Sequence, residues 1–237
     1  MRGKLPLLKI LWASMGLIFC TVLLVLSVPR LVGSLYALYP ETLLKQNTRI
    51  KDDIYSKAIT QLDVALGWHN DAHYWQDKSL CYLALYHSTT ATKEEKVEAL
   101  LQADHSMEQS LLLSPIDPST WYKLAAVRDL SGAASVPIQS AYQLSLYSGR
   151  VEPDIIISRL SFGLEHLKVL DYETTDLWLK QIPIAYSLQA KELVKLVIAN
   201  PALKTFVFAE LLFQNEKLTK FIQDFEIANQ QTLKTAH

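Results

Sequence analysis

Residues 10–29 read ILWASMGLIFCTVLLVLSVP, and none of these twenty residues carries a charge. Twenty helical residues rise about 30 Å, which is the thickness of the hydrocarbon core of a bilayer. A helix is the expected conformation because lipid offers the backbone groups no other hydrogen-bond partners. The stretch therefore predicts a transmembrane helix over residues 10–29, preceded by a short leader at residues 1–9.

Three interpretations of this stretch compete. A cleaved signal peptide has a shorter apolar core and small residues before its cleavage site, whereas this run is long and ends in VPR at 28–30. A lipoprotein signal has small residues just before its cysteine, whereas Ile18 and Phe19 precede Cys20. A retained signal-anchor fits the sequence best.

The charges around the apolar run predict its orientation. Arg2, Lys4 and Lys9 crowd the leader, and basic residues favour the cytoplasmic side of a membrane. Residues after about 30 are then expected on the exported side. Basic residues at 30, 45, 49 and 51 weaken this bias, although long domains translocate largely regardless of their charge.

The overall composition excludes some classes of protein. The chain of 237 residues has 23 basic and 24 acidic residues mixed along its length, so it has no electrostatic footprint for nucleic acid, and no nucleic-acid partner is expected. Its two cysteines, Cys20 and Cys81, lie in the apolar run and in the soluble part, and cannot pair within one folded chain.

The soluble part shows helical spacing throughout and no long alternation of apolar and polar residues. We interpret residues 30–50 as a juxtamembrane linker, 51–231 as one all-α domain and 232–237 as a frayed tail. Gly149 suits a helix C-cap, and Pro183 is expected to separate two helices. The expected helices are 52–68, 75–86, 93–113, 118 to about 132, 137–147, one starting at 152–154, 172–182, 188–199, 201–213 and 216–229.

Three segments begin alike, which indicates an internal repeat. They read DAHYW at 71–75, DPSTW at 117–121 and EPDII at 152–156, each with an acidic residue expected to cap a helix. Their spacings of 46 and 35 residues compare with about 34 for a tetratricopeptide helix–turn–helix unit.

The middle segment matches a tetratricopeptide unit best. The positions that match its pattern are Trp121, Leu124, Ala125, Gly132, Ala141 and Leu144. Arg128 stands where an aromatic residue is usual and Pro137 where a small one is usual, so the repeat is degenerate. The predicted fold class is all-α, with an N-terminal transmembrane helix followed by a TPR-like solenoid.

Longer stretches of the chain resemble a bacterial family. They are SPIDPSTWYKLAAVRDLSGA (114–133), SLYSGRVEPDIIISRLSFGL (145–164) and QIPIAYSLQAKELVKLV (181–197). They are similar to membrane-anchored accessory proteins of exopolysaccharide gene clusters, the VpsP type. The resemblance implies localisation in the bacterial envelope and a supporting role in surface polysaccharide production. Together with the apolar run and its flanking charges, it leads us to expect a single-pass protein of the inner membrane with a periplasmic domain. It also implies protein partners in a polysaccharide synthesis or export complex, and no catalytic, cofactor-binding or metal-binding residues to carry over.

His69 and His73 are the best candidate metal ligands because two histidines four apart can share one helix face. Asp71 and Asp77 lie nearby, but Asn70 follows His69, where a metalloprotease signature has its general-base glutamate. Since Asn70-Asp71 resembles a helix cap, these histidines are interpreted as flanking a surface turn, and no metal is expected.

The other candidates for chemistry also have simpler interpretations. Asp104-His105 and Glu165-His166 are adjacent pairs, whose side chains diverge on a helix. Ser110 and Cys81 have no recognisable partner, and Cys81 lies among apolar neighbours. The tryptophans at 68, 75, 121 and 178 suit either a sugar-binding groove or helix packing, and the fixed offsets of Trp75 and Trp121 from a cap favour packing for these two.

The expected function is therefore a non-enzymatic scaffold that supports exopolysaccharide biosynthesis or export. Two alternatives remain open: an adaptor of another envelope assembly process, and a cryptic metal-dependent hydrolase built on His69 and His73.

Overall fold

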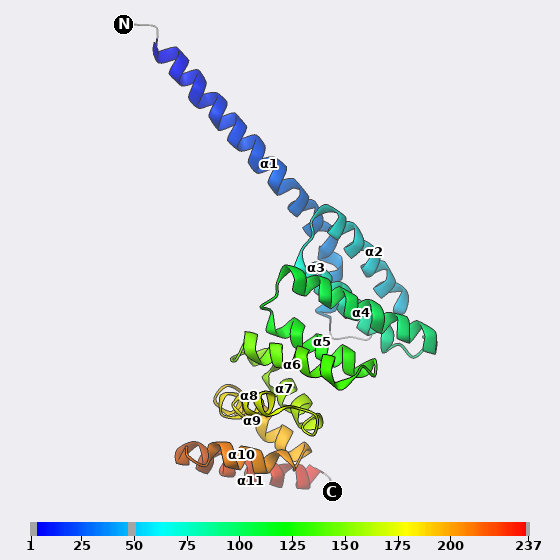
Figure 1. The fold of residues 1–237 in the computed structure, drawn as a ribbon, viewed down its shortest axis with the longest axis vertical. Helices are drawn as coiled ribbons and strands as arrows, with labels where there is room; N and C mark the ends of the chain where they lie inside the picture. Colours follow the sequence, from blue (N-terminus) through cyan, green and yellow to red (C-terminus); the bar gives the residue numbers. More distant parts are fainter. Residues whose placement is uncertain (1–3, 47–50, 236–237) are drawn as a thin grey trace. The chain divides into compact units, whose positions relative to one another are not determined.

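A computed structural model describes residues 4–46 and 51–235, and all the regular secondary structure in these ranges is helical (Figure 1). The helices are α1 (Lys4–Leu44), α2 (Asp52–Trp68), α3 (Ala72–Tyr86), α4 (Lys93–Leu113), α5 (Pro118–Leu130), α6 (Ser135–Ser148), α7 (Pro153–Glu165), α8 (Tyr172–Leu179), α9 (Gln181–Ala199), α10 (Leu203–Leu211) and α11 (Asn215–Thr235). The predicted all-α class is confirmed. The stacking of helix pairs into a TPR-like solenoid stays a prediction.

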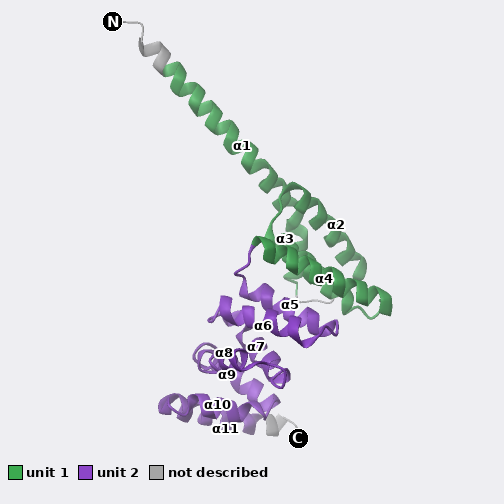
Figure 2. Cartoon of the chain, viewed as in Figure 1, with its two compact units in different colours: residues 1–113 green, residues 114–237 purple. Residues whose placement is uncertain are grey.

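The chain divides into two compact units, residues 1–113 with α1 to α4 and residues 114–237 with α5 to α11 (Figure 2). The division falls at the SPIDP turn that follows α4. Two prolines there disfavour helix in the residues that precede them, so the long α4 ends at Leu113.

Helix α1 is long and apolar enough to cross a membrane, judged by its length and composition. It runs unbroken for 41 residues, with Pro29 and Pro40 inside it. The stretch 30–50, interpreted from the sequence as a linker, is thus helical as far as Leu44, and residues 47–50 lie outside the described residues. The C-terminal part of α1 packs on α2 and α3 because small residues, among them Gly33 and Ala37, line its buried face.

The core of the first unit lies where α1, α2 and α3 meet. Its fully buried side chains are Ala58, Leu62, Ala65 and Cys81, and the mostly buried Ala37 completes it from α1. The α3–α4 pair is close because small residues face one another: the buried Ser79 hydroxyl donates to the Ala103 carbonyl at 3.1 Å. Helix α2 spans the predicted bounds of 52–68, and α4 those of 93–113.

The core of the second unit surrounds α7. Trp178 and Tyr142 are fully buried, and both contact Gly163 so closely that a Cβ there would lie 2.3 Å from Trp178 Cδ1 and 2.6 Å from Tyr142 Oη. The glycine therefore lets α7 approach α6 and α8. Of the residues matched to packing positions of a tetratricopeptide unit, Leu124, Ala125 and Ala141 are buried, whereas Leu144 is 42% exposed.

Several boundary predictions need correction. Gly149 is the C-cap residue of α6, as predicted, but its backbone is extended, with φ −151°, rather than left-handed, and glycine suits it because a Cβ would lie 2.6 Å from Pro118 Cγ. Glu152 makes no side-chain cap to α7, whereas Asp71 and Asp117 do cap α3 and α5.

Two further predictions differ toward the C-terminus. Pro183 does not separate two helices, because it lies in the first turn of α9, where proline needs no amide hydrogen; the break inside α9 falls at Gln189 instead. The stretch from 232, predicted to fray, is helical as far as Thr235. Residues 236–237 lie outside the described residues.

Candidate functional site

A polar node in the first unit joins the start of α2 to the loop between α3 and α4. Oδ2 of Asp52, the first residue of α2, accepts hydrogen bonds from the Ser88 hydroxyl and from Thr90 Oγ1, the latter at 2.5 Å. The Ser88 hydroxyl also accepts from the Thr90 amide at 3.1 Å. A carboxylate is favourable at this helix N-terminus because the helix dipole is positive there. The node fixes the shape of the loop.

Two hollows flank this node and share Asp52, Ser88 and Thr90, so we treat them as one polar groove. The first hollow has a volume of 640 Å³ and is also lined by Tyr55 and His87. The second has a volume of 460 Å³ and is also lined by Ser56, Tyr82, Glu95 and Glu98. Both volumes lie in the range of sites that hold a small ligand or the side chains of a partner.

The glutamates of the polar groove form hydrogen bonds within α4 and to the residue before it. Glu95 Oε2 accepts from the Thr92 amide at 2.7 Å and the Thr92 hydroxyl accepts from the Glu95 amide, a capping box that starts α4. Glu98 accepts from Gln102 at 2.8 Å. Together with Asp52 and Asp53, these groups outnumber Lys51, which also lines the groove, and the net acidic lining favours cationic or donor-rich partners.

The candidate metal ligands lie at the turn between α2 and α3. His69 is the C-cap residue of α2, and its Nε2 lies 3.6 Å from Asp71 Oδ2. Nε2 of His73 lies 4.0 Å from Asp77 Oδ2. Among the described residues, no group of three or more histidine, cysteine or acidic side chains is placed to hold a metal ion.

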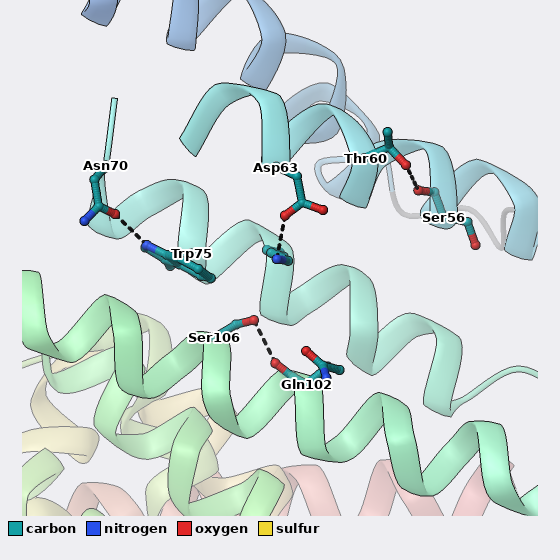
Figure 3. Close-up of polar contacts among 8 residues, drawn as sticks. Ser56, Thr60, Asp63, Asn70, Trp75, Gln102 and Ser106 are labelled. Carbon is teal, nitrogen blue, oxygen red and sulfur yellow. Dashed lines mark hydrogen bonds and ion pairs between the residues drawn. The ribbon is translucent and has the colours of Figure 1, made fainter. Parts of the chain in front are cut away.

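Asn70 and Asp71, which the sequence analysis compared to a helix cap, have different roles at this turn. Asp71 Oδ1 accepts from the His73 amide at 2.8 Å and caps α3. Oδ1 of Asn70 accepts from the indole N–H of Trp75 at 2.7 Å (Figure 3). Asp63 on α2, which is labelled in the same view, forms an ion pair with Lys78 on α3 at 2.6 Å. These contacts hold α2 and α3 together.

In each of the two adjacent acid–histidine pairs, the histidine contacts a residue from another helix. His105 packs edge-on to Trp75, with ring centroids 6.3 Å apart. His166 bonds to Asp129, 37 residues away, through Nε2 at 2.9 Å, rather than to its neighbour Glu165. Its Nδ1 lies 2.9 Å from the Phe162 carbonyl. The sequence offered no sign of the Asp129 contact because it depends on how α5 and α7 pack.

Ser110 and Cys81 are both fully buried, so neither is placed as a nucleophile. Burial, with a smaller effect of the Asp77 charge, raises the pKa of the Cys81 thiol to about 12. The interpretation of Cys81 as a small core residue is confirmed.

The four tryptophans have separate environments. Trp68 is half exposed, and the indole N–H groups of Trp75 and Trp121 donate to Asn70 and to the Pro115 carbonyl. Trp178 is a core residue whose N–H donates to the Leu160 carbonyl at 3.1 Å. Trp178 therefore packs in the core, Trp75 and Trp121, for which the sequence favoured packing, are partly buried, and the groove of the first unit is lined by tyrosines.

Arg159 is the important residue that sequence reasoning missed. It is fully buried on α7, and its guanidinium donates to the Gly149 carbonyl at 2.6 Å and to both oxygens of Ser145. Burial lowers its pKa to about 10, partly offset by Tyr142 and Glu152. The cation thus sits at the C-terminal end of α6, where the helix dipole is negative.

Comparisons of the chain with models of known families, with curated protein sequences and with solved structures gave no match. The resemblance to VpsP-type proteins therefore stays a prediction based on the three quoted stretches.

Proposed function

We propose that this protein is a membrane-anchored scaffold that supports exopolysaccharide synthesis or export by binding other proteins of that machinery. The assignment to exopolysaccharide synthesis or export rests on the sequence resemblance, whereas the scaffold role is supported by the geometry. One observation carries the proposal. Helix α1 runs without a break from the apolar stretch at 10–29 into the packed helices of the first unit.

Helix α1 packs closely against α2 and α3. A Cβ on Gly33 would lie 3.2 Å from the Ala65 carbonyl oxygen and 3.4 Å from the Tyr74 ring. Ala37 and Leu43 extend the contact further along α1. An anchor joined in this way holds the polar groove at a fixed place relative to the membrane, whereas a flexible linker leaves a domain free to move.

The polar groove is the proposed docking site. Its acidic lining attracts a basic partner segment, and Tyr55 and Tyr82 offer contact area. The Asp52 node orders the groove before a partner arrives, which reduces the entropy lost on binding. In this proposal the soluble part lies in the periplasm of a bacterium and the leader lies in the cytoplasm.

A binding role also agrees with the state of the reactive side chains. The Cys81 thiol is buried with a raised pKa, and Glu95 serves as a cap. His166 is bonded at both ring nitrogens. An adaptor of another envelope process would use the same geometry, so the identity of the partner decides between the two.

Affinity purification of the full chain from detergent-solubilised membranes tests this proposal. The groove variant is Glu98→Lys, and the matched control is Glu108→Lys, which reverses the same charge on the same helix outside the groove lining. We expect the native chain and the control to retain proteins of polysaccharide polymerisation or export, and Glu98→Lys to lose them. Equal capture by both variants, or capture only of proteins from another envelope process, would contradict the proposal.

A further inference from the structure

Helix α1 carries an apolar residue at every seventh position over its whole described length. These residues are Ile10, Leu17, Leu24, Leu31 and Leu38. Each is between 56% and 69% exposed. A repeat of seven keeps these side chains on one stripe when two helices wind around each other.

A second series lies four residues after the first and completes a heptad repeat. Its members are Ser14, Thr21, Val28, Leu35 and Thr42. We call the two series together the α1 seam, with the first at the d positions and the second at the a positions. The hydroxyls of Ser14, Thr21 and Thr42 donate to carbonyls of α1 itself, at 3.0, 2.8 and 2.9 Å. Covering the seam therefore leaves none of these hydroxyls without a partner.

The packing of the first unit uses the opposite face of α1. The buried residues there are Gly33, Ala37, Pro40 and Leu43, which occupy positions f, c, f and b of the same heptads. Pro29, at a b position, also lies off the seam. Neighbouring helices α2 and α3 thus leave the seam free while they bury the other side of α1.

Lipid covers only part of the seam in the proposed topology. The charge-free run ends at Pro29, and Arg30 follows it. Leu31, Leu35 and Leu38 lie beyond this charge, and they are 61%, 62% and 56% exposed. Three leucines on one stripe outside the hydrocarbon core leave apolar area in water, which favours a protein partner.

We infer that α1 pairs two copies of this chain through the α1 seam as a parallel, two-stranded coiled coil. Leucine at the d positions with β-branched residues at a favours two strands, and Thr21, Val28 and Thr42 are β-branched. Two copies inserted in one membrane in the same orientation run parallel, so identical heptads meet in register. At roughly 100 Å² for each of its six leucine-sized side chains, the seam supplies on the order of 600 Å² per copy, or about 1,200 Å² in total, which is the lower end of the range for specific interfaces.

This inference goes beyond the proposed function and does not depend on the identity of any partner. Pairing through α1 gives the assembly two polar grooves. Two linked sites raise the apparent affinity for a repeated or paired partner without any new contact.

Disulfide trapping in membranes tests the seam. In a Cys20→Ser background, cysteine replaces Leu31 or Leu38 at d positions, and Tyr36→Cys at a b position is the control. All three positions are exposed, so an oxidant reaches them alike. We expect cross-linked dimer several-fold more abundant for the two d variants than for the control. Equal cross-linking at all three positions would overturn the inference.

The mass of the full chain in detergent micelles, measured by light scattering, provides the second test. We expect a dimer for the native chain and for Tyr36→Glu, and a monomer for Leu31→Glu/Leu38→Glu. A native monomer, a higher oligomer, or a dimer that survives the double substitution would overturn the pairing through this seam. None of these results depends on whether proteins of polysaccharide synthesis or export are captured. The pairing through α1 and the proposed scaffold function can therefore be refuted independently.

Discussion

Arg159 on α7 donates a hydrogen bond from Nη1 to the carbonyl oxygen of Gly149, 2.6 Å away, at the end of α6. The Ser145 hydroxyl accepts from the same guanidinium and donates to the Pro118 carbonyl at 2.6 Å. The Tyr142 hydroxyl donates to the backbone carbonyl of Arg159 at 2.7 Å. One buried cation thus joins α5, α6 and α7.

Replacing this arginine is expected to destabilise the second unit strongly. Arg159→Met keeps much of the side-chain volume but leaves the Gly149 and Ser145 oxygens without their donor, which costs about 2–4 kcal/mol. The free energy of unfolding in urea, followed by tryptophan fluorescence of the full chain, checks this. Arg150→Met, at an exposed position, is the control and is expected to change stability by under about 0.5 kcal/mol. Similar values for the two variants would show that Arg159 does not hold the unit together.

Gly163 is expected to tolerate no side chain. In Gly163→Ala the new Cβ would lie 2.3 Å from Trp178 Cδ1, so α7 and α8 must separate, at a cost of about 1–3 kcal/mol or more. Gly67→Ala is the matched control, because nothing lies within 4 Å of its Cβ in α2, and it is expected to stabilise by about 0.5–1 kcal/mol. Thermal unfolding of both variants measures the contrast. A neutral Gly163→Ala would mean that the helices are less closely packed than described.

The stability of the second unit is expected to depend on the protonation of His166. Burial lowers the pKa of this imidazole, but the bonds to Asp129 and to the Phe162 carbonyl, with the Glu165 charge, raise it more, so the net pKa lies above 6.5. A raised folded-state pKa gives a stabilisation that is complete below the unfolded value and is lost as pH rises through the folded value. The unfolding free energy of the native chain should therefore fall as the pH rises from about 6.5 through the higher pKa of folded His166.

Asp129→Asn removes the largest raising interaction and is expected to flatten that part of the pH dependence. NMR titration of the His166 ring gives the pKa directly in both chains. A native value at or below 6.5, or no change in the variant, would refute this coupling.

Cys81 is expected to resist thiol reagents in the folded chain. It is fully buried in the first unit, and burial raises its pKa to about 12, so almost no thiolate forms at neutral pH. In a Cys20→Ser chain, modification by a maleimide should follow only after unfolding in urea. Rapid labelling under native conditions would show that the α1–α2–α3 core opens readily.

Local sequence patterns predicted the helices well and their contacts poorly. Asp117 followed by Pro118 sets the start of α5 through bonds between neighbours in the chain, and the structure has that cap. Gly149 also looked like a local signal, yet its role comes from Pro118, which lies 31 positions earlier and comes close only through the packing of α5 on α6. Patterns within one helical turn can be read from a sequence, whereas such contacts between helices cannot.

The candidate site shows the same limit. His69 and His73 stood out because of their spacing, but the turn between α2 and α3 gives each its own aspartate. The polar groove did not stand out, because Asp52 and Ser88 are 36 positions apart and common at helix ends and loops. Nothing in the sequence marks Arg159 as buried, because its acceptors at Gly149 and Ser145 come close only when α6 packs against α7.

The scaffold proposal depends on α1 spanning the membrane with both units on the exported side. Alkaline phosphatase, which is active only after export, can be fused after residue 45 and after residue 230 of the chain. We expect both fusions to be active and to remain in the membrane fraction after an alkaline wash. Inactive phosphatase at both positions, or a full-length chain that is freely soluble, would contradict the proposal.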